Sequence, residues 1–555
     1  MRPRHKGTGC TDLAEGLTRG RLTRGGLTRR ARVAAAAGLA VPALAAPAVA
    51  ADVRAATLRF VPQRDLTWFD PTFWPFLETR NHAMMIYDTL FGTDAAGVVQ
   101  PQMAEGHVVE DGGRRWRIRL REGLMFHDGS PVLARDCVAS ILRWGGQNMM
   151  GQALMAATAE VMAPDDRTIV FRLERRFPML LAALGATGMA SCVIMPARIT
   201  EGAEFRAIGE SIGSGPFRFL AGERQAGRML VYARHDGYVP RGSGTASFTA
   251  GPKLAHFDRV EWHVMPDAGA ALGALRSGMV DWWEGPPASA YPVIAGDRGM
   301  TLRVHEHTGF IGTMRMNHLT FPFNDPAIRR AVLPAVDQDG FMAAAHGGSA
   351  EYRRAAVGFF TPQSPMASAA GMAALPVPPD LARARAALAA TRYRGEPVVV
   401  LGIADMPAPR AMAVLGAEML RRIGFSVELV EVPISGLVPR LLRPQTAGTG
   451  GWNVVFGYWS GLDHWHPGMH RYLSAEGAAS EVGWPTSEAL EAMRRAWLAA
   501  PDLAAQRSVA ADIQVQAFAD VPYVPLGQWV RPTAYAAGLT GMLDGYPLFW
   551  NLQRG

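Results

Sequence analysis

A strand, a tight turn and the start of a helix are encoded in the stretch Leu120-Arg121-Glu122-Gly123-Leu124-Met125-Phe126-His127-Asp128-Gly129-Ser130-Pro131. Residues 116–120 alternate apolar and basic side chains, and this period of two is typical of a half-buried strand. The Asp128-Gly129 pair predicts the turn, because glycine readily adopts the backbone angles that tight turns require. Beyond the turn, apolar side chains at helical spacing from Ala134 to Leu142 predict a helix whose apolar stripe faces the core.

The later half of the chain alternates strand and helix signals. Residues 398–403 are a continuous apolar run, and residues 410–423 form an amphipathic pattern that ends before Gly424. Residues 425–430 then predict a second strand, and residues 453–456 a further buried one. A β-α-β crossover is the natural interpretation, so we expect an α/β domain built on a largely parallel sheet.

Length and charge set limits on the class of protein. A chain of 555 residues with 49% hydrophobic residues exceeds one hydrophobic core, so we expect two or more lobes. The formal charge of +7 comes entirely from the first fifty residues, which hold nine Lys or Arg against Asp12 and Glu15. The remainder is formally neutral, so the sequence predicts no nucleic-acid partner and no electrostatic attraction to an anionic membrane.

The N-terminus has the pattern of a secretory signal. The paired Arg29 and Arg30 precede the apolar run 33–44, and Ala48-Val49-Ala50 matches a cleavage site. We expect residues 1–50 to be a cleaved signal peptide that directs the protein to the periplasm by the Sec or the twin-arginine route. No later apolar run reaches the length of a membrane span.

The cysteines predict no disulfide framework. Cys10 lacks the small apolar residues that precede a lipidated cysteine, so a lipoprotein is not expected. Cys137 and Cys192 remain after cleavage of the leader. We expect two separately buried thiols, with pairing as the alternative.

The opening stretch resembles the signature of the peptide/nickel family of extracellular solute-binding proteins, relatives of dipeptide and oligopeptide binders. Further segments resemble the same family in the same order along the chain. They are Ile86–Phe91, Pro101–Glu105, Gly213–Phe217, Leu275–Asp281, Asn317, Pro322–Ala331 and Glu418–Phe425. The resemblance therefore spans essentially the whole chain after the leader.

The resemblance implies a two-lobed α/β periplasmic binding protein of the large type, class II or cluster C, with an extra inserted domain. The expected first lobe is discontinuous and comprises residues 51–85, 208–282 and 525–555. The expected inserted small domain is 86–207, and the expected second lobe is 283–524.

The implied function is transport. Such a protein captures a peptide or similar small organic solute between its lobes and delivers it to the permease and ATPase of an ABC importer. Closure about a hinge buries the ligand, and the closed shape is what an importer can distinguish from the empty one. We expect a monomer that needs no cofactor and is not an enzyme. A chaperone or a sensor on the same fold is an alternative.

Candidate ligand contacts lie where the chain is expected to cross between lobes. In peptide-binding relatives, an aspartate in a Trp-[Ser/Thr]-Gly-Asp context holds the free amine of the ligand, and Asp463 is the nearest match, displaced by Leu462. His466 occupies another position that is often acidic in those relatives. A solvated loop carboxylate is the alternative for Asp463. The complete set of predicted ligand contacts is Trp68, Trp283, Glu284, Trp459, Asp463 and Trp465, with core packing as the alternative for each tryptophan.

Two other chemistries are weighed against ligand capture. His464, His466 and His470 form a compact cluster that could bind nickel or a metal complex, but Pro467 and Gly468 interrupt any regular geometry. Residues 209–213 match the G-x-S-x-G pattern of secreted hydrolases, which would make Ser211 a nucleophile. That motif needs a helix immediately after it, whereas a turn and a strand are predicted here, so we interpret the match as accidental.

Overall fold

The computed structural model describes residues 56–73, 76–189, 191–203, 206–443 and 450–555. The predicted leader, residues 1–50 with its paired arginines and cleavage pattern, lies outside these ranges. Among the described helices, none combines the length and the apolar character that a membrane span needs.

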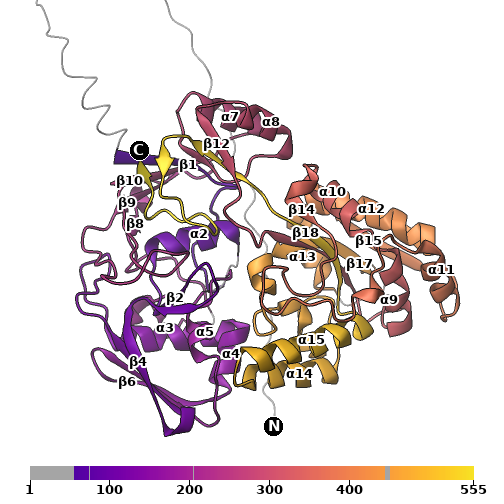
Figure 1. The fold of residues 1–555 in the computed structure, drawn as a ribbon, viewed down its shortest axis with the longest axis horizontal. Coiled ribbons are helices and arrows are strands. Elements are labelled where there is room, and N and C mark those ends of the chain that lie inside the picture. The colour runs from indigo at the N-terminus through magenta and orange to yellow at the C-terminus, as the bar shows by residue number, and fades with distance from the viewer. Residues whose placement is uncertain (1–55, 74–75, 190, 204–205, 444–449) are drawn as a thin grey trace, which may run out of the picture. The chain divides into compact units, whose positions relative to one another are not determined.

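A seven-stranded sheet forms the core of the first lobe (Figure 1). Its middle strand β1 (Thr57–Val61) pairs in parallel with β10 on one side and β11 on the other. The strand order is β12 (Met300–Arg303), β19 (Thr533–Ala536), β11 (Trp282–Trp283), β1, β10 (Arg259–His263), β9 (Met229–Arg234) and β8 (Phe217–Phe219). This part of the chain also holds α2 (Leu77–Ile86), α7 (Ala268–Arg276), α8 (Tyr291–Ala295) and the pair β20 (Leu539–Thr540) with β21 (Gln553–Arg554).

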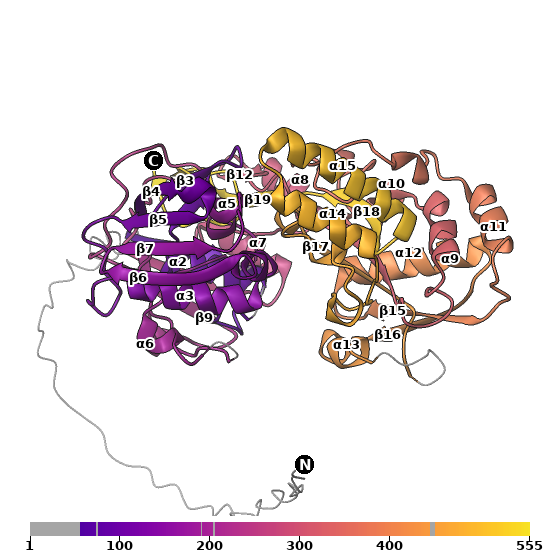
Figure 2. The same cartoon turned by 90° about the horizontal axis from the view of Figure 1, so that it is seen from below.

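The predicted inserted domain contains its own antiparallel sheet. Figure 2 shows its four strands side by side in the order β4, β5, β7, β6. The strands are β4 (Ala104–Glu110), β5 (Arg115–Leu120), β7 (Thr168–Leu173) and β6 (Thr158–Asp165), and β2 (Phe91–Thr93) pairs separately with β3 (Val99–Pro101). The helices are α3 (Ala134–Gln147), α4 (Met149–Met155), α5 (Leu180–Leu184) and α6 (Ala197–Thr200).

The opening stretch folds as the sequence predicts, with one correction. Strand β5 alternates exposed and buried residues, Gly129 has a φ of +83°, and α3 follows. The predicted apolar stripe is wrong at Leu142, which is 46% exposed. Helix α3 instead buries Cys137, Ile141 and Trp144. Each helical residue turns the side chain by about 100°, which carries Leu142 out of the arc that contains Ile141.

A six-stranded sheet forms the core of the second lobe. The order is β14 (Arg353–Arg354), β18 (Val524–Trp529), β13 (Phe310–Met316), β17 (Val454–Ser460), β15 (Pro397–Ile403) and β16 (Ser426–Val432). The predicted β-α-β unit is confirmed, since β15 and β16 pair in parallel and α12 (Pro407–Ile423) connects them. The sheet is nevertheless mixed, because β13 runs antiparallel to both β17 and β18. The other helices are α9 (Pro326–Val332), α10 (Gln338–His346), α11 (Leu381–Ala389), α13 (Ile434–Leu441), α14 (Glu488–Ala499) and α15 (Leu503–Asp520).

Two strands lie in a different sheet from the one that the expected lobe boundaries imply. Strand β12 lies in the seven-stranded sheet, although residues from 283 onward were expected in the second lobe. Strand β18 lies in the six-stranded sheet, although residues from 525 onward were expected in the first lobe. Both strands pair by their backbones, and single-strand patterns carry no information about the partner. We therefore propose that the chain crosses between lobes at residues 304–309 and 530–532.

Apolar packing joins the lobes. One core cluster contains side chains of the inserted domain together with side chains of the six-stranded sheet and its helices. A second cluster, built around the seven-stranded sheet, includes Leu462 from the segment that follows β17. Cys137 and Cys192 are buried free thiols, in keeping with the expectation of two separate ones.

Candidate ligand-binding site

The first crossing packs against the end of β18, where the second crossing begins. Gly309 has a φ of +51°, and a Cβ at this position would lie 2.2 Å from the carbonyl oxygen of Trp529 and 2.9 Å from the Val530 side chain. The Gln528 side chain donates to the Thr308 carbonyl at 2.7 Å, and the Gly461 amide donates to the Gly309 carbonyl at the same distance. Glycine is thus required at 309 by its backbone angle and by the close approach of the end of β18.

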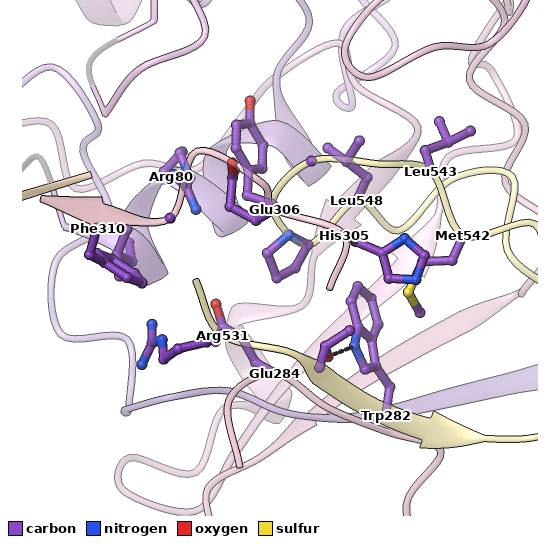
Figure 3. Close-up of a pocket in the computed structure, with 16 residues that line it drawn as sticks. Arg80, Trp282, Glu284, His305, Glu306, Phe310, Arg531, Met542, Leu543 and Leu548 are labelled. Carbon is purple, nitrogen blue, oxygen red and sulfur yellow. Dashed lines mark hydrogen bonds between the residues drawn. The ribbon is translucent and has the colours of Figure 1, made fainter. Parts of the chain in front are cut away.

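A central pocket lies beside these crossings (Figure 3). Figure 3 shows charged side chains gathered at one end of the pocket, with Met542 and Leu543 at the other. The charged residues are Arg80 on α2, Glu284 after β11, Glu306 in the first crossing and Arg531 in the second. The remaining lining residues are Leu77, Trp282, His305, Gly309, Phe310, Thr533, Gly545, Tyr546, Pro547 and Leu548. The pocket therefore offers both signs of charge beside an apolar surface.

Glu284, a predicted ligand contact, lines this pocket and is held by its own lobe. Its Oε2 accepts a hydrogen bond from the Gln63 amide at 2.8 Å, and its Oε1 accepts one from the Asn81 side chain at 2.9 Å. Burial raises the pKa of this carboxyl, and the negative Glu78 adds to the effect. The Gln63 side chain in turn accepts from Arg531 at 2.9 Å, so Glu284 also helps to orient that guanidinium.

A second pocket, the Asp463 cleft, contains two more predicted contacts, Trp459 and Asp463. It lies between the inserted domain and the second lobe, because residues of α4 and the segment 186–189 face residues of α14 across it. The Oδ1 atom of Asp463 accepts a hydrogen bond from the Met189 amide at 3.2 Å. A Cβ at Gly188 would lie 2.4 Å from the same oxygen, so only glycine lets this segment approach the carboxylate so closely.

One carboxylate oxygen of Asp463 is left without a hydrogen bond. Its Oδ2 atom is buried and has no hydrogen-bond partner among the described residues. Burial raises the pKa of the carboxyl from its ordinary value of 3.8 to about 6, while the Met189 amide and the positive Arg80 oppose that rise. A buried carboxylate oxygen without a partner is costly, and a cationic group of a ligand would satisfy it.

A third pocket, the Trp283 cleft, contains the predicted contact Trp283. It is lined on one side by residues 61–64 and 285–288 of the first lobe and on the other by Tyr458, Trp529 and residues 405–409 of the second. Trp283 itself is 5% exposed and belongs to a core cluster of the first lobe. Its role is therefore mainly packing, with one edge at the cleft.

Two predicted contacts, Trp68 and Trp465, line none of these three pockets. Trp68 is 42% exposed. Trp465 covers the turn between β2 and β3, since a Cβ at Gly97 would lie 3.2 Å from its ring. Four of the six predicted residues thus lie at a pocket, and these four remain our candidates for ligand contact.

The side chains of the histidine cluster pack against neighbouring aromatic rings. The rings of His464 and His470 lie 4.1 Å apart, and His470 contacts the Tyr523 hydroxyl at 3.0 Å. His466 points elsewhere and stacks on Trp497. Burial lowers the pKa of His464 and of His466 to about 4, which favours neutral rings. Within the described ranges, no group of three or more His, Cys, Asp or Glu side chains is placed to hold a metal ion.

Ser211 lacks the setting of a hydrolase nucleophile. The segment after it turns against the end of α2, where a Cβ at Gly213 would lie 1.9 Å from the Ile86 carbonyl oxygen. The next regular element is the strand β8, not a helix. The strand-turn-helix geometry that exposes such a serine is therefore absent from this described segment.

Arg80, Arg531 and Tyr546 are pocket residues that the sequence did not single out. They lie in three separate parts of the chain, on α2, in the second crossing and in the C-terminal segment. No motif surrounds them. The only available signal was the charge of Arg531, and the crossing beside it was expected elsewhere. Glu306 belongs to the segment His305-Glu306-His307, which the sequence offers only as a weak metal candidate.

Known proteins resemble the chain in sequence and in fold. Residues 98–480 match the family described as bacterial extracellular solute-binding proteins, family 5 Middle. A relative from Sinorhizobium fredii, named as a probable peptide ABC transporter periplasmic-binding protein, y4tO, is 33% identical over 493 residues, which cover 88% of this chain and 92% of the relative.

Two solved structures illustrate the likeness in fold. The periplasmic binding protein DppA from Helicobacter pylori, in complex with the peptide STSA, has a TM-score of 0.72 at 18% identity and covers 91% of this chain and 99% of its own. The oligopeptide-binding protein AppA from Bacillus subtilis, in complex with a nonapeptide, has a TM-score of 0.70 at 19% identity, covering 90% and 99%. At these identities the likeness shows the fold alone, and the predicted two-lobed α/β fold is confirmed.

Proposed function

The chain belongs to family 5 of the bacterial extracellular solute-binding proteins, and from that premise we propose that it captures a peptide between its lobes and delivers it to the permease and ATPase of an ABC importer. The name of the Sinorhizobium relative, a probable peptide ABC transporter periplasmic-binding protein, supports a peptide as the ligand. The protein acts by binding and release, and it is not an enzyme.

The observation that carries the proposal is the environment of Asp463. One carboxylate oxygen receives an amide from across the cleft, and the other is buried without a protein partner. The terminal ammonium of a peptide supplies the missing donors and the opposite charge. Trp459 lines the same cleft and offers an aromatic surface beside the carboxylate.

The location is extracytoplasmic, as the family implies. We further propose that residues 1–50 act as the signal peptide that directs export to the periplasm, by the Sec or the twin-arginine route. The basic leader and the apolar run 33–44 support this assignment.

A metal carrier is the less favoured alternative. His464 and His470 face each other, but His470 is already bonded to Tyr523 and to the Phe359 carbonyl, and His466 stacks on Trp497. Recruiting these rings for nickel would require breaking buried hydrogen bonds and a packed aromatic pair.

Binding measurements on the chain from residue 51 test the proposal. A defined mixture of di- to pentapeptides is added, bound species are identified by native mass spectrometry, and the tightest binder is titrated by calorimetry with its amine free and acetylated. We expect the free amine to bind roughly 10- to 100-fold more tightly than the acetylated form. Asp463→Asn should abolish that preference, whereas Glu476→Gln, an exposed carboxylate at the same cleft, should retain it. If no peptide binds at millimolar concentration, the proposal is wrong.

A further inference from the structure

Three aromatic side chains from the two lobes meet beside the Trp283 cleft, which His346 helps to line. Tyr291 begins α8, between β11 and β12 of the seven-stranded sheet, whereas His346 and Tyr352 lie between β13 and β14 of the six-stranded sheet. The ring centroid of Tyr291 lies 5.8 Å from that of His346 and 5.3 Å from that of Tyr352, and the two second-lobe rings are 6.0 Å apart. Aromatic rings at such distances attract each other. We name these three residues the interlobe aromatic cluster.

The second-lobe half of the cluster is held by its own lobe. Gly347 has a φ of +66°, a left-handed angle that favours glycine, and it ends α10 directly after the imidazole. The Tyr352 carbonyl accepts a hydrogen bond from the Val530 amide at 2.8 Å, where the second crossing begins. Arg353 donates to the Gly348 carbonyl at 2.9 Å, which closes the loop between the two rings. Both rings are therefore carried on a loop that the second lobe holds by itself.

Tyr291 is buried by the second lobe rather than by its own. It is 7% exposed, yet among the described residues it belongs to none of the hydrophobic core clusters, whereas its neighbour Ala290 belongs to a first-lobe cluster. Its hydroxyl lies 3.4 Å from Nε2 of His346. Burial, together with the positive Arg531 and Arg353, lowers the pKa of His346 to about 4, so the imidazole is neutral and can accept from that hydroxyl. Separation of the lobes would expose the Tyr291 ring to water.

We propose that the interlobe aromatic cluster holds the lobes together and thereby sets how long a ligand stays bound, without touching the ligand. Neither tyrosine lines any of the three pockets. Opening breaks both ring pairs of Tyr291, and each pair favours the closed form by about 2- to 10-fold. The inference rests on the lobe motion of the proposed function and adds the residues that oppose opening.

Peptide release tests the effect on residence time. The tightest-binding peptide of the di- to pentapeptide mixture is bound in isotope-labelled form to the chain from residue 51, chased with excess unlabelled peptide, and followed by native mass spectrometry. Tyr291→Ala should release it roughly 10- to 100-fold faster, and should speed the release of every other bound peptide by the same factor. Tyr291→Phe keeps the ring pairs and should change the rate by less than about 3-fold.

Tyr393→Ala is the matched control. Tyr393 is also 7% exposed, but its ring lies 4.8 Å from that of Phe425 in the same lobe. Its loss should lower the melting temperature and leave the rate of peptide release unchanged. A merely structural role of Tyr291 would give this same pattern.

A disulfide across the lobes tests the geometry directly. A Cβ at Gly348 would lie 3.4 Å from the Cβ of Ala288, close to the roughly 3.8 Å of a disulfide. The pair Ala288→Cys and Gly348→Cys should therefore cross-link the lobes, and the new side chain at 348 displaces the His346 ring, which is 2.8 Å away, so that the covalent bond replaces the aromatic contact. The oxidised double variant should retain its labelled peptide through the chase, and reduction should restore release.

Small-angle X-ray scattering without ligand separates this inference from the proposed function. Oxidation of the double variant should lower its radius of gyration, because the bond keeps the lobes from opening. Equal radii before and after oxidation, or release from Tyr291→Ala at the wild-type rate, would overturn the inference. If no peptide binds to the wild type while oxidation still compacts the double variant, the proposed function is wrong and the interlobe contact is supported.

Discussion

Replacing Leu462 with alanine should weaken ligand capture without weakening the fold of either lobe. Leu462 follows β17 of the second lobe, yet it is 8% exposed and belongs to the core cluster around the first-lobe sheet. The change removes three carbon atoms, and at about 0.8 kcal/mol for each it costs about 2 kcal/mol of contact between the lobes. Since 1.4 kcal/mol is a tenfold change in an equilibrium constant, closure becomes roughly 30-fold less favourable.

Calorimetric titration with the tightest-binding peptide measures this loss as a rise in Kd of up to about 30-fold. Urea unfolding of the ligand-free protein should change by less than about 0.5 kcal/mol, because we expect the lobes to separate without ligand and to expose Leu462, and an exposed loop residue contributes little to stability. Leu388→Ala is the matched control: this leucine is 4% exposed and lies on α11, so its loss should lower the free energy of unfolding by about 2–5 kcal/mol and leave Kd unchanged. If Leu462→Ala behaves as Leu388→Ala does, Leu462 is an ordinary core residue and the lobes do not separate there.

Three further predictions concern charge and close packing. The pKa of Asp463 is raised from 3.8 to about 6, so a free-amine peptide should bind about tenfold more weakly for each pH unit below 6, level off above it, and show a flat profile with Asp463→Asn. Without ligand, the raised pKa of Asp463 stabilises the fold below pH 4, and this contribution is lost as the pH rises through 6. Melting temperatures of the wild type and of Asp463→Asn, measured across this pH range, will detect the difference. Gly188→Ala places a Cβ 2.4 Å from Asp463 Oδ1 and should raise Kd more than tenfold in the same titration, whereas Gly106→Ala, with open space around it, should not. Arg143→Met leaves Asp70 as an unpaired buried charge and should cost about 3–5 kcal/mol in urea unfolding, while Arg172→Met breaks only an exposed pair and should cost less than about 1 kcal/mol.

The fold was largely predictable because its signals are local. The period of two in β5, the Asp128-Gly129 turn and the β15-α12-β16 crossover each depend on residues adjacent in the chain. The sheets that β12 and β18 join could not be predicted, since each strand enters its sheet through backbone pairing with a distant strand, and the moved lobe boundaries are our proposal. Leu142 was placed on the wrong face of α3 because apolar character alone does not fix which arc of a helix packs.

The candidate site was less predictable because it is assembled from distant segments. Asp463, Trp459, Trp283 and Glu284 were accessible to sequence reasoning, since each lies at or just beyond the end of a strand, β11 or β17. Arg80 and Tyr546 meet only in the folded protein, 466 positions apart, and neither belongs to a motif. Trp465 shows what size and polarity alone leave open: they suggest a cleft, but the ring covers the turn beside Gly97, and a ligand contact by Trp465 stays a prediction.

Leu462 and Asp463 are adjacent, and their roles cannot be independent. Both lie on one short 3-10 turn, Gly461–His464, which Ser460 caps by accepting a hydrogen bond from the Leu462 amide. In the structure Leu462 packs in the first-lobe core while Asp463 accepts from the Met189 amide, and under the proposed function a ligand amine at Asp463 would favour the same arrangement. We therefore expect closure and recognition to be one equilibrium, biased by an apolar contact and by an ion pair. Loss of Leu462 should weaken every ligand by the same factor, whereas loss of the Asp463 charge should weaken only ligands with a free amine.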